Sequence, residues 1–383
     1  MKIGPQSGYS GYSGYSGYSG YSGYSGYSGY SGYSGYSGYS GYSGGLPVAP
    51  FVPPALITTR DGIVGSWEQP TLAPKALAVN DPDNLSLWSS EVRESLYMFE
   101  MISRVGFTME GEVARLWHLE ADANGAGTPS TSYKPLLNMS RMTPDGFKDQ
   151  TAYIEQYADL RQDRALEIET QLDLPTAFFG SIAYLNASRT KYTYELILAA
   201  LKLANFTEMR LKHALAARRP VEYSPQLQSI ISNPLHGSLP SGHATEAHIV
   251  ATVLTRVLEA SGNDVYDLEG WRAQFFRLAA RIAVNRTVAG VHFPVDSAAG
   301  ACLGITLGDY LVARASKANK YAAWEFDGAG FTGDFEPETM YDIPNSRQQN
   351  SLAHTKLGSE TIDGSDQSPI LSHVWDEAVK EWA

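Results

Sequence analysis

The triplet Gly-Tyr-Ser recurs without interruption from residue 8 to residue 43, twelve times in all. It contains no aliphatic side chain, and a segment without aliphatic side chains cannot bury a hydrophobic core. We therefore expect residues 1–45 to be disordered, so that the core of this 383-residue chain comes from the rest. That remainder is long enough for one substantial core.

The repeat leaves more than one role open. Glycine at every third position is typical of collagen, but the triplets contain no proline, so an isolated triple helix would be weak. A flexible tether is the simplest interpretation, and triplets this uniform also fit an artificial linker. Tracts of this composition also self-associate, which gives a non-enzymatic hypothesis: repeat-driven self-association or a scaffold role.

The chain after the repeat divides into three parts. Residues 46–85 are rich in Pro and Ala without a sustained period, and we expect an extended surface segment. Residues 86–318 show apolar residues at helical spacing, apart from expected loops at 122–144 and 221–240, and form the expected catalytic domain. Helices are expected within it at residues 190–217, 241–260 and 294–315. Residues 319–383 form a polar, loop-like C-terminal extension, closed by a short amphipathic segment. The predicted fold is an all-α helical bundle.

Charge and cysteine content exclude some classes of protein. The formal net charge of −12 argues against nucleic acid as a partner, because phosphate backbones require a basic face. The only cysteine, Cys302, rules out an intrachain disulfide. Its neighbours Ala-Gly-Ala before it and Leu-Gly-Ile after it indicate a buried helical position.

No stretch of the sequence has the length and apolarity of a membrane span. The longest candidates, residues 196–206 and 248–260, are short and contain Lys202 and Arg256. The N-terminus shows no apolar run of the kind found in secretory signals. We therefore expect a soluble, cytoplasmic protein without a transmembrane segment, with unconventional export as an open alternative.

Three short segments carry the residues from which a function can be inferred. The first is Lys212, six residues, then Arg219-Pro220; the second is Pro240-Ser241-Gly242-His243; the third is Arg286, five residues, His292, three residues, Asp296. Guanidinium forks and a lysine ammonium fit the oxygens of a tetrahedral oxyanion. Together the segments predict an oxyanion site.

Helix geometry adds detail to this prediction. Lys212 and Arg219 are seven residues apart, about two helical turns, so we expect both on one face of a helix. Ser241 and Gly242 are expected at a helix N-terminus, where free N–H groups and the helix dipole favour an anion. Asp296, four residues after His292, is expected to orient its imidazole, although a carboxylate in the first helical turn after Pro294 is also favoured on its own.

These three segments resemble the signature shared by vanadium-dependent haloperoxidases and type-2 phosphatidic acid phosphatases, a superfamily that includes soluble bacterial acid phosphatases. The resemblance is strict from Lys212 to Asp296. It implies a helical bundle of the haloperoxidase and acid phosphatase type. Asn285 departs from it, since many phosphatases have Ser before the arginine, but several haloperoxidases also lack that Ser.

The resemblance also implies roles for individual residues. His292 is implied to bond the central atom, as the axial ligand of vanadium(V) in a haloperoxidase or as the phosphohistidine nucleophile in a phosphatase. His243 is implied to act as general acid and base on the opposite side. Lys212, Arg219, Ser241, Gly242 and Arg286 are implied to bind vanadate or phosphate, and Lys212 also to polarise the peroxide.

Two activities remain open, and we favour a vanadate-dependent haloperoxidase that oxidises bromide or iodide with hydrogen peroxide. The segment 283–292 resembles the bromoperoxidase form, and His236 stands seven residues before His243, where bromoperoxidases also carry His. A loop histidine in contact with water is an equally good interpretation of His236. Met209 points the other way, since many haloperoxidases have Trp there.

The alternative is a soluble phosphomonoesterase of the acid phosphatase type, which would use His292 as its nucleophile and no cofactor. The haloperoxidase would require vanadate, hydrogen peroxide, a halide and a small organic acceptor. In either case we expect a homo-oligomer, a dimer or larger, by analogy with related enzymes.

Overall fold

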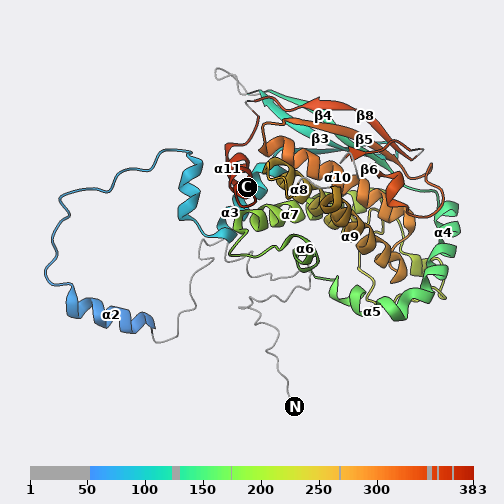
Figure 1. Ribbon diagram of the computed structural model, residues 1–383, viewed down its shortest axis with the longest axis horizontal. Coiled ribbons are helices and arrows are strands. Elements are labelled where there is room, and N and C mark those ends of the chain that lie inside the picture. Colours follow the sequence, from blue (N-terminus) through green and yellow to red (C-terminus); the bar gives the residue numbers. More distant parts are fainter. Residues whose placement is uncertain are drawn as a thin grey trace, which may run out of the picture. The chain divides into compact units, whose positions relative to one another are not determined.

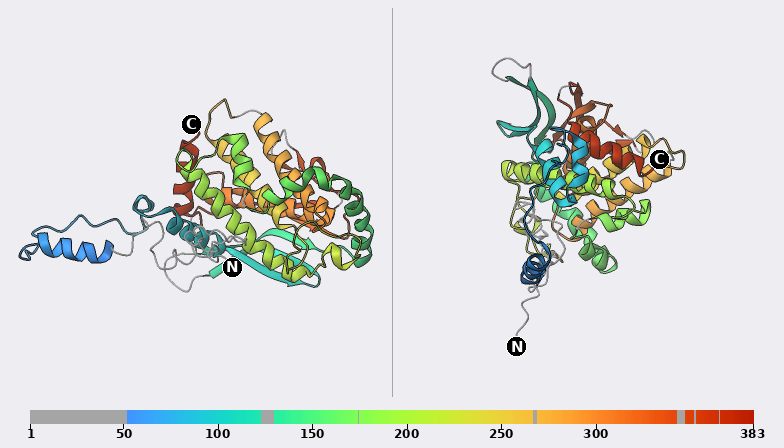
Figure 2. Two further views of the ribbon diagram at one scale, coloured as in Figure 1. Left: turned by 90° about the horizontal axis from the view of Figure 1, so that it is seen from below. Right: turned by 90° about the vertical axis from the view of Figure 1, so that its left-hand side faces the viewer.

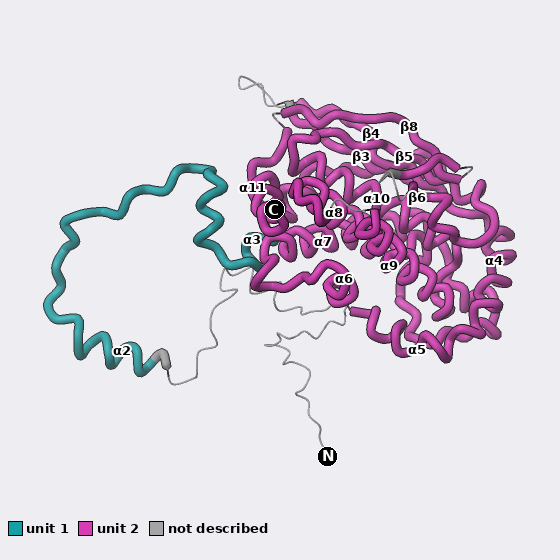
Figure 3. Tube along the Cα trace, in the orientation of Figure 1, with its two compact units in different colours: residues 1–95 teal, residues 96–383 magenta. Residues whose placement is uncertain are grey.

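The structure is a computed structural model that describes residues 52–122, 130–173, 175–266, 269–342, 347–351, 353–364 and 366–383. The Gly-Tyr-Ser repeat, predicted to be disordered, lies outside the described residues. The chain divides into two compact units, residues 1–95 and 96–383 (Figure 3). The boundary falls within helix α3, Ser90–Ile102.

The described part of the first unit is more regular than the sequence predicted. Instead of an extended segment, it contains helix α2, Val52–Ile63, followed later by the short 3-10 helix η3, Pro82–Leu87. Prolines occupy the first turn of α2 and Arg60 its last turn. Both placements are favourable for a helix, because proline needs no N–H partner there and a cation complements the helix dipole.

The second unit contains most of the helices. They are α4 Pro144–Tyr157, η4 Ala158–Leu160, α5 Arg161–Thr170, α6 Thr176–Ala183, α7 Lys191–Leu215, η5 Pro220–Glu222, α8 Gly242–Ala260, α9 Glu269–Val288, α10 Pro294–Ala315, η6 Pro337–Thr339 and α11 Pro369–Lys380. The predicted helices at Thr190–Ala217, Ser241–Ala260 and Pro294–Ala315 are confirmed to within two residues. No helix in the described part of the chain is long and apolar enough to cross a membrane.

Helix α10 forms the centre of this unit. Nearly all of its residues are buried, including the predicted buried Cys302, and it packs most extensively against α8. Three glycines at four-residue spacing, Gly300, Gly304 and Gly308, face α8, where a Cβ at any of them would overlap atoms of that helix. The absence of side chains at these positions lets the two helices approach closely.

A mixed sheet covers the other side of α10 (Figures 1 and 2). Its strands lie in the order β2-β3-β4-β5-β8, and the β4–β5 pair is parallel whereas the others are antiparallel. Their bounds are β2 Val105–Glu110, β3 Val113–Asp122, β4 Ser130–Ser140, β5 Lys320–Asp327 and β8 His354–Thr361. A separate two-stranded pair joins β6, Tyr341–Asp342, to β7, Arg347–Gln348.

The sheet corrects the all-α prediction, which holds only for the helical core. Strand β4 occupies the middle of the predicted loop 122–144, and β5 and β8 lie in the predicted loop-like extension. Strand β4 pairs with β5, nearly two hundred residues further along the chain, through contacts such as Leu137 with Trp324. Pairing and packing of this kind, rather than local propensity, stabilise a strand, so the local sequence gave little signal.

His248 on α8 lies in the hydrophobic core. Its side chain is 2% exposed, contacts Phe276 of α9 with ring centroids 6.2 Å apart, and donates from Nδ1 to the carbonyl oxygen of Ala244 at 2.7 Å. Burial lowers the pKa of His248 to about 4. The folded protein therefore holds this imidazole neutral.

This burial predicts a loss of stability in acid. Between the ordinary histidine pKa and about 4, the unfolded chain binds a proton that folded His248 does not, so stability falls as pH decreases. The contribution approaches about 3 kcal/mol near the lower end. His248→Gln should remove that part of the loss, measured by urea unfolding at a series of pH values. His213→Gln, at an exposed position on α7, is the control; equal acid sensitivity in wild type and His248→Gln would contradict the prediction.

Candidate active site

The C-terminal end of α7 places the first predicted residues. Lys212 lies in the last turn and is 2% exposed. The helix ends at Leu215, and Ala216 adopts a left-handed conformation with φ 49°. Arg219 therefore lies beyond the helix, and the prediction that one helical face presents both residues is wrong. The turn after the helix, rather than helical periodicity, returns Arg219 to the same region.

Lys212 is anchored by the loop that leads into α8. Its Nζ donates to the carbonyl oxygens of Pro240 and, at 3.5 Å, Ser238. Burial lowers the pKa of Lys212 to about 8, with the nearby Glu208 charge opposing this shift and Arg219 adding to it. The ammonium is thus held in place and remains mostly charged at neutral pH.

Arg219 uses every N–H of its guanidinium within the protein. Nε donates to the His236 carbonyl oxygen at 3.0 Å, Nη1 to the Val291 carbonyl oxygen at 2.8 Å and to His292 Nε2 at 3.1 Å. Nη2 donates to His236 Nδ1 at 3.1 Å and to the Gly237 carbonyl oxygen at 3.2 Å. An anion can therefore accept an N–H of Arg219 only by replacing one of these acceptors. His292 Nε2 is the acceptor most easily replaced, because its lone pair can bond the central atom of the anion instead.

The N-terminus of α8 supplies backbone donors. Ser241 is the N-cap, its Oγ accepts from the Ala244 N–H at 3.4 Å, and its own N–H donates to the Asp296 carbonyl oxygen at 2.9 Å. Gly242 is the first helical residue and is buried. Its N–H belongs to the first turn, which has no acceptor within the helix.

His292 has a defined tautomer. Nδ1 lies 3.0 Å from Asp296 Oδ2, while Nε2 lies 3.1 Å from Arg219 Nη1. Because a guanidinium only donates, Nε2 must be the acceptor, and the proton lies on Nδ1. Asp296 Oδ2 also accepts from the Phe293 N–H at 2.9 Å and from the Ser238 hydroxyl, so the same carboxylate caps α10 and holds the imidazole.

Burial and positive charge keep both histidines of the site neutral. Burial is the main cause that lowers the pKa of His292 well below its ordinary value, and the charges of Arg219 and Lys212 add to it. The pKa of His243 is lowered in the same way, first by burial and then by Arg286 and Lys212. Neutral His292 carries its lone pair on Nε2, as a nucleophile or a ligand requires, and in this structure that lone pair accepts from Arg219 Nη1.

Arg286 on α9 has guanidinium donors without a hydrogen-bond partner in the described part of the chain. Its side chain is fully buried, and Nη2 donates to Gln171 Oε1 at 3.0 Å and to the Ile168 carbonyl oxygen at 3.3 Å. Nε and Nη1 have no hydrogen-bond partner within the described part of the chain. A buried charged donor without an acceptor is costly, so Nε and Nη1 are candidate donors to an anion.

The structure accounts for the departure at Asn285. This residue is fully buried and donates from Nδ2 to Gln171 Oε1 at 2.9 Å and to Glu167 Oε1 at 3.0 Å. It thus fixes Gln171, which in turn holds Arg286. Gln171 also bonds His243 through its backbone, so the end of α5 positions two site residues.

Four residues of this region were not predicted as site residues from the sequence. Glu208 is 2% exposed and lies one helical turn before Lys212; Glu246 lies three residues after His243 on α8. These spacings place each on the same helical face as its partner, a signal that was available. Gln171 and Ser238 had no such signal, because only the tertiary fold brings them to the site.

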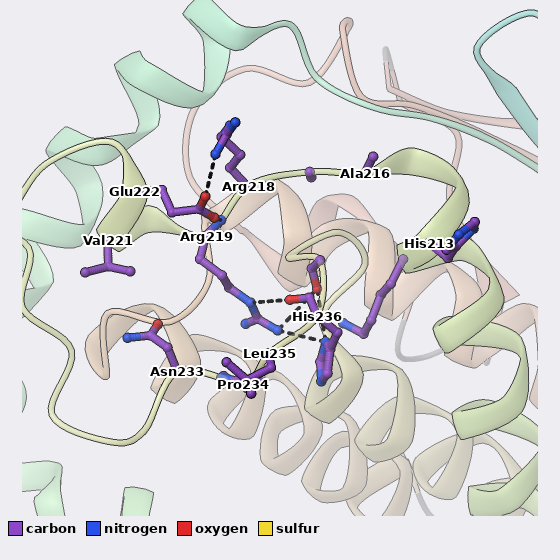
Figure 4. Close-up of a pocket in the computed structure, with 13 residues that line it drawn as sticks. His213, Ala216, Arg218, Arg219, Val221, Glu222, Asn233, Pro234, Leu235 and His236 are labelled. Atoms are coloured by element: carbon purple, nitrogen blue, oxygen red, sulfur yellow. Dashed lines mark hydrogen bonds and ion pairs between the residues drawn. The ribbon is translucent and has the colours of Figure 1, made fainter.

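His236 lies at the edge of the site, exposed at the mouth of a pocket of about 520 Å³ that is also lined by Lys212 and Arg219 (Figure 4). Its Nδ1 accepts from Arg219, as described above. Desolvation of the ring and the positive charges of Lys212 and Arg219 lower the pKa of His236 to about 4. Arg218 points away from Arg219 and pairs with Glu222 at 2.6 Å.

A second cluster of ligand-type side chains lies against the sheet, away from these motifs. His118, Glu120 and Asp366 place one potential ligand atom each within 4.8 Å of one another. Cations already occupy the carboxylates: Arg104 pairs with Asp366, and Lys134 pairs with Glu120. We interpret this cluster as an ion-pair network that fastens β3 to the C-terminal segment.

The comparisons with known proteins bear on the helical core. The sequence model of the PAP2 superfamily matches residues 194–320. Similar solved structures include the crystal structure of a transmembrane PAP2-type phosphatidylglycerolphosphate phosphatase from Bacillus subtilis, with 21% identity over 44% of this chain and 85% of that chain and a TM-score of 0.33. A search of curated proteins finds no match. Residues 194–320 therefore form a PAP2 superfamily domain, and the three motifs from Lys212 to Asp296 lie within it.

Proposed function

We propose that this chain is an enzyme that binds a tetrahedral oxyanion between Lys212, Arg219, Arg286 and the N-terminus of α8, with His292 bonding the central atom. The observation that carries the proposal is the state of His292. Asp296 holds its Nδ1–H at 3.0 Å, and Nε2 keeps its lone pair 3.1 Å from the Arg219 guanidinium. A neutral imidazole whose lone pair lies among buried cations is suited to an electrophilic centre that carries negative oxygens.

The donor set of the site fits vanadate as well as phosphate. Arg286 has two buried nitrogens, Nε and Nη1, without a hydrogen-bond partner among the described residues, and Gly242 offers a backbone N–H without a Cβ. Both anions are tetrahedral in solution and accept hydrogen bonds at each oxygen. Vanadium(V) also accepts an imidazole nitrogen as a ligand, and neutral His292 would supply that nitrogen.

Our first candidate is therefore a vanadate-dependent haloperoxidase. Vanadium(V), when bound, would act as a Lewis acid that activates hydrogen peroxide for two-electron oxidation of bromide or iodide to hypohalous acid. The hypohalous acid would then halogenate a small organic acceptor. His236 supports this candidate, because its hydrogen bond to Arg219 couples a histidine at the pocket mouth to the oxyanion site.

The residues of the chain have separate tasks in this proposal. Lys212, Arg219 and Arg286 neutralise the charge of the oxyanion. Burial is the main cause that lowers the pKa of His243, and the nearby cations add to it, so the negative charge of a bound oxyanion would raise that pKa again in part. His243 would then hold or deliver a proton at an oxygen of the bound anion.

One observation favours the second candidate, a phosphomonoesterase. The pocket of about 520 Å³ beside Lys212 and Arg219 has room for an organic leaving group. His292 Nε2 would attack phosphorus, and the ester oxygen would leave with a proton from His243. Water would then hydrolyse the phosphohistidine and regenerate the free imidazole.

A paired assay on metal-free protein distinguishes the two candidates. One arm follows bromination of a dione reporter with vanadate, peroxide and bromide; the other follows hydrolysis of an aryl phosphate without vanadate. Vanadate-dependent bromination supports the haloperoxidase. Phosphate release that vanadate blocks, with little bromination, supports the phosphatase, and neither activity would refute both. Light scattering on the same samples checks the predicted homo-oligomer.

Arg286→Lys tests the oxyanion site directly. The substitution keeps the charge but removes Nε and Nη1, two donor atoms without a partner among the described residues, each of which can form a charge-assisted hydrogen bond. We expect the affinity for orthovanadate and inorganic phosphate to fall about tenfold to a hundredfold, since one such bond contributes about 1.5–3 kcal/mol. Calorimetric titration measures it. Arg277→Lys, at an exposed position on the same helix, is the matched control; equal loss in both variants would refute the assignment.

A further inference from the structure

Glu208 is a buried carboxylate inside a cluster of cations. Its side chain is 2% exposed, and its Oε2 has no hydrogen-bond partner among the described residues. Lys212, one turn further along α7, directs its Nζ to the carbonyl oxygens of Ser238 and Pro240 instead. A buried carboxylate oxygen without a donor needs an explanation, because burial without a hydrogen bond destabilises the fold.

The position of Glu208 supplies that explanation. A Cβ built on Gly242 would lie 2.5 Å from Glu208 Oε1 and 3.2 Å from Oε2, so the carboxylate lies directly against the first residue of α8. Gly242 is also the residue whose N–H is expected to bind the oxyanion. An acceptor and a donor therefore lie side by side at the same end of the site.

We propose that Glu208 selects oxyanions that carry a proton, by accepting a hydrogen bond from their O–H group. This inference rests on the proposed oxyanion site. Hydrogen phosphate, hydrogen arsenate and hydrogen vanadate each have an O–H to donate at neutral to mildly alkaline pH. Sulfate and selenate have none, so a carboxylate meets only their negative oxygens, which it repels.

The protonation states of Glu208 and its neighbours are compatible with a role as hydrogen-bond acceptor. Burial raises the pKa of Glu208 to about 7, opposed by Lys212 on α7 and by Arg219 in the following loop. Glu246 on α8 faces it, and burial and the Glu208 charge raise the pKa of Glu246 well above its ordinary value. Above a pH of about 7, Glu208 is thus an ionised acceptor while Glu246 holds its proton, and the pair of Glu208 and Glu246 carries one negative charge rather than two.

The test compares matched anions by calorimetric titration at a pH above the raised pKa of Glu208. The probes are inorganic phosphate against sulfate, and arsenate against selenate, which are pairs of similar size that differ in the proton. Wild-type protein should bind the protonated member of each pair at least about a hundredfold more tightly. Glu208→Gln replaces the acceptor by an amide that also donates, and should reduce this ratio at least tenfold, mainly through tighter sulfate binding.

Glu195→Gln is the control, since Glu195 is another buried carboxylate on α7, which accepts from Tyr97 at 3.3 Å. It should leave the ratio unchanged. An unchanged ratio in Glu208→Gln would overturn the proposal but leave the oxyanion site intact. If Glu208→Gln does not fold, the wild-type affinities still test the proposal, because equal affinity for phosphate and sulfate refutes selection. Wild-type protein that binds none of the four anions refutes the site, and the selection with it.

Discussion

His292→Ala is expected to abolish both candidate activities, with kcat/KM falling about a thousandfold or more. The reason is that no other described side chain combines a neutral imidazole, a carboxylate at 3.0 Å on Nδ1 and a guanidinium at 3.1 Å from Nε2. The fold should persist, because Asp296 still accepts from the Phe293 N–H and the Ser238 hydroxyl. The paired bromination and hydrolysis assays measure the loss, and circular dichroism checks the fold.

His248→Gln provides the control for this experiment, since it removes another buried histidine of the same domain. It should retain most of the activity. Added imidazole should restore part of the activity of His292→Ala, because the cavity left by the side chain lies beside Arg219. Full activity of folded His292→Ala would refute the assignment of His292 in both candidate functions.

Gly304→Ala is expected to have the largest effect on stability, with the free energy of unfolding reduced by about 2–3 kcal/mol. The added Cβ would overlap the Thr245 carbonyl oxygen and lie 3.0 Å from both His248 Cβ and Ile249 N. Two of these atoms belong to the backbone of α8, so no side-chain rotation relieves the overlap. Helix α8 must shift as a unit, and its N-terminal Gly242 with it. Urea unfolding measures the stability, and phosphate titration measures the displaced site.

Gly270→Ala is the matched control. Gly270 lies in the first turn of α9, with no atom within 4 Å of an added Cβ, so alanine there should be neutral or stabilise the helix by up to about 1 kcal/mol. If Gly304→Ala unfolds at the same urea concentration as wild type, the close approach of α8 and α10 contributes nothing to stability, and the prediction fails.

The helical core was readable from sequence because its signals are local. Ser241 marks the start of α8 and Pro294 that of α10, and both helices begin where predicted. Apolar spacing located α7 to within two residues. The sheet could not be predicted in this way, because β4 and β5 pair across nearly two hundred residues. No short stretch of the sequence indicates which strand will be its partner.

The site divides in the same way. Motif spacing identified the cationic and histidine side chains, since residue type alone limits which of them can hold an oxyanion. It misplaced Arg219, which was expected on the helix with Lys212, because the left-handed Ala216 that ends α7 has no recognisable residue signature. It also missed Glu208, although the four-residue spacing from Lys212 was available.

The sequence by itself determined which groups are present and in which order: two arginines, a lysine, two histidines and a helix N-terminus, within a PAP2 superfamily domain. Only the tertiary structure decided how they are used. Arg219 is saturated by protein acceptors while Arg286 keeps two free donors, and an unpaired Glu208 lies against Gly242. The physical reason is that hydrogen bonding and desolvation depend on neighbours from distant parts of the chain, which local sequence does not specify.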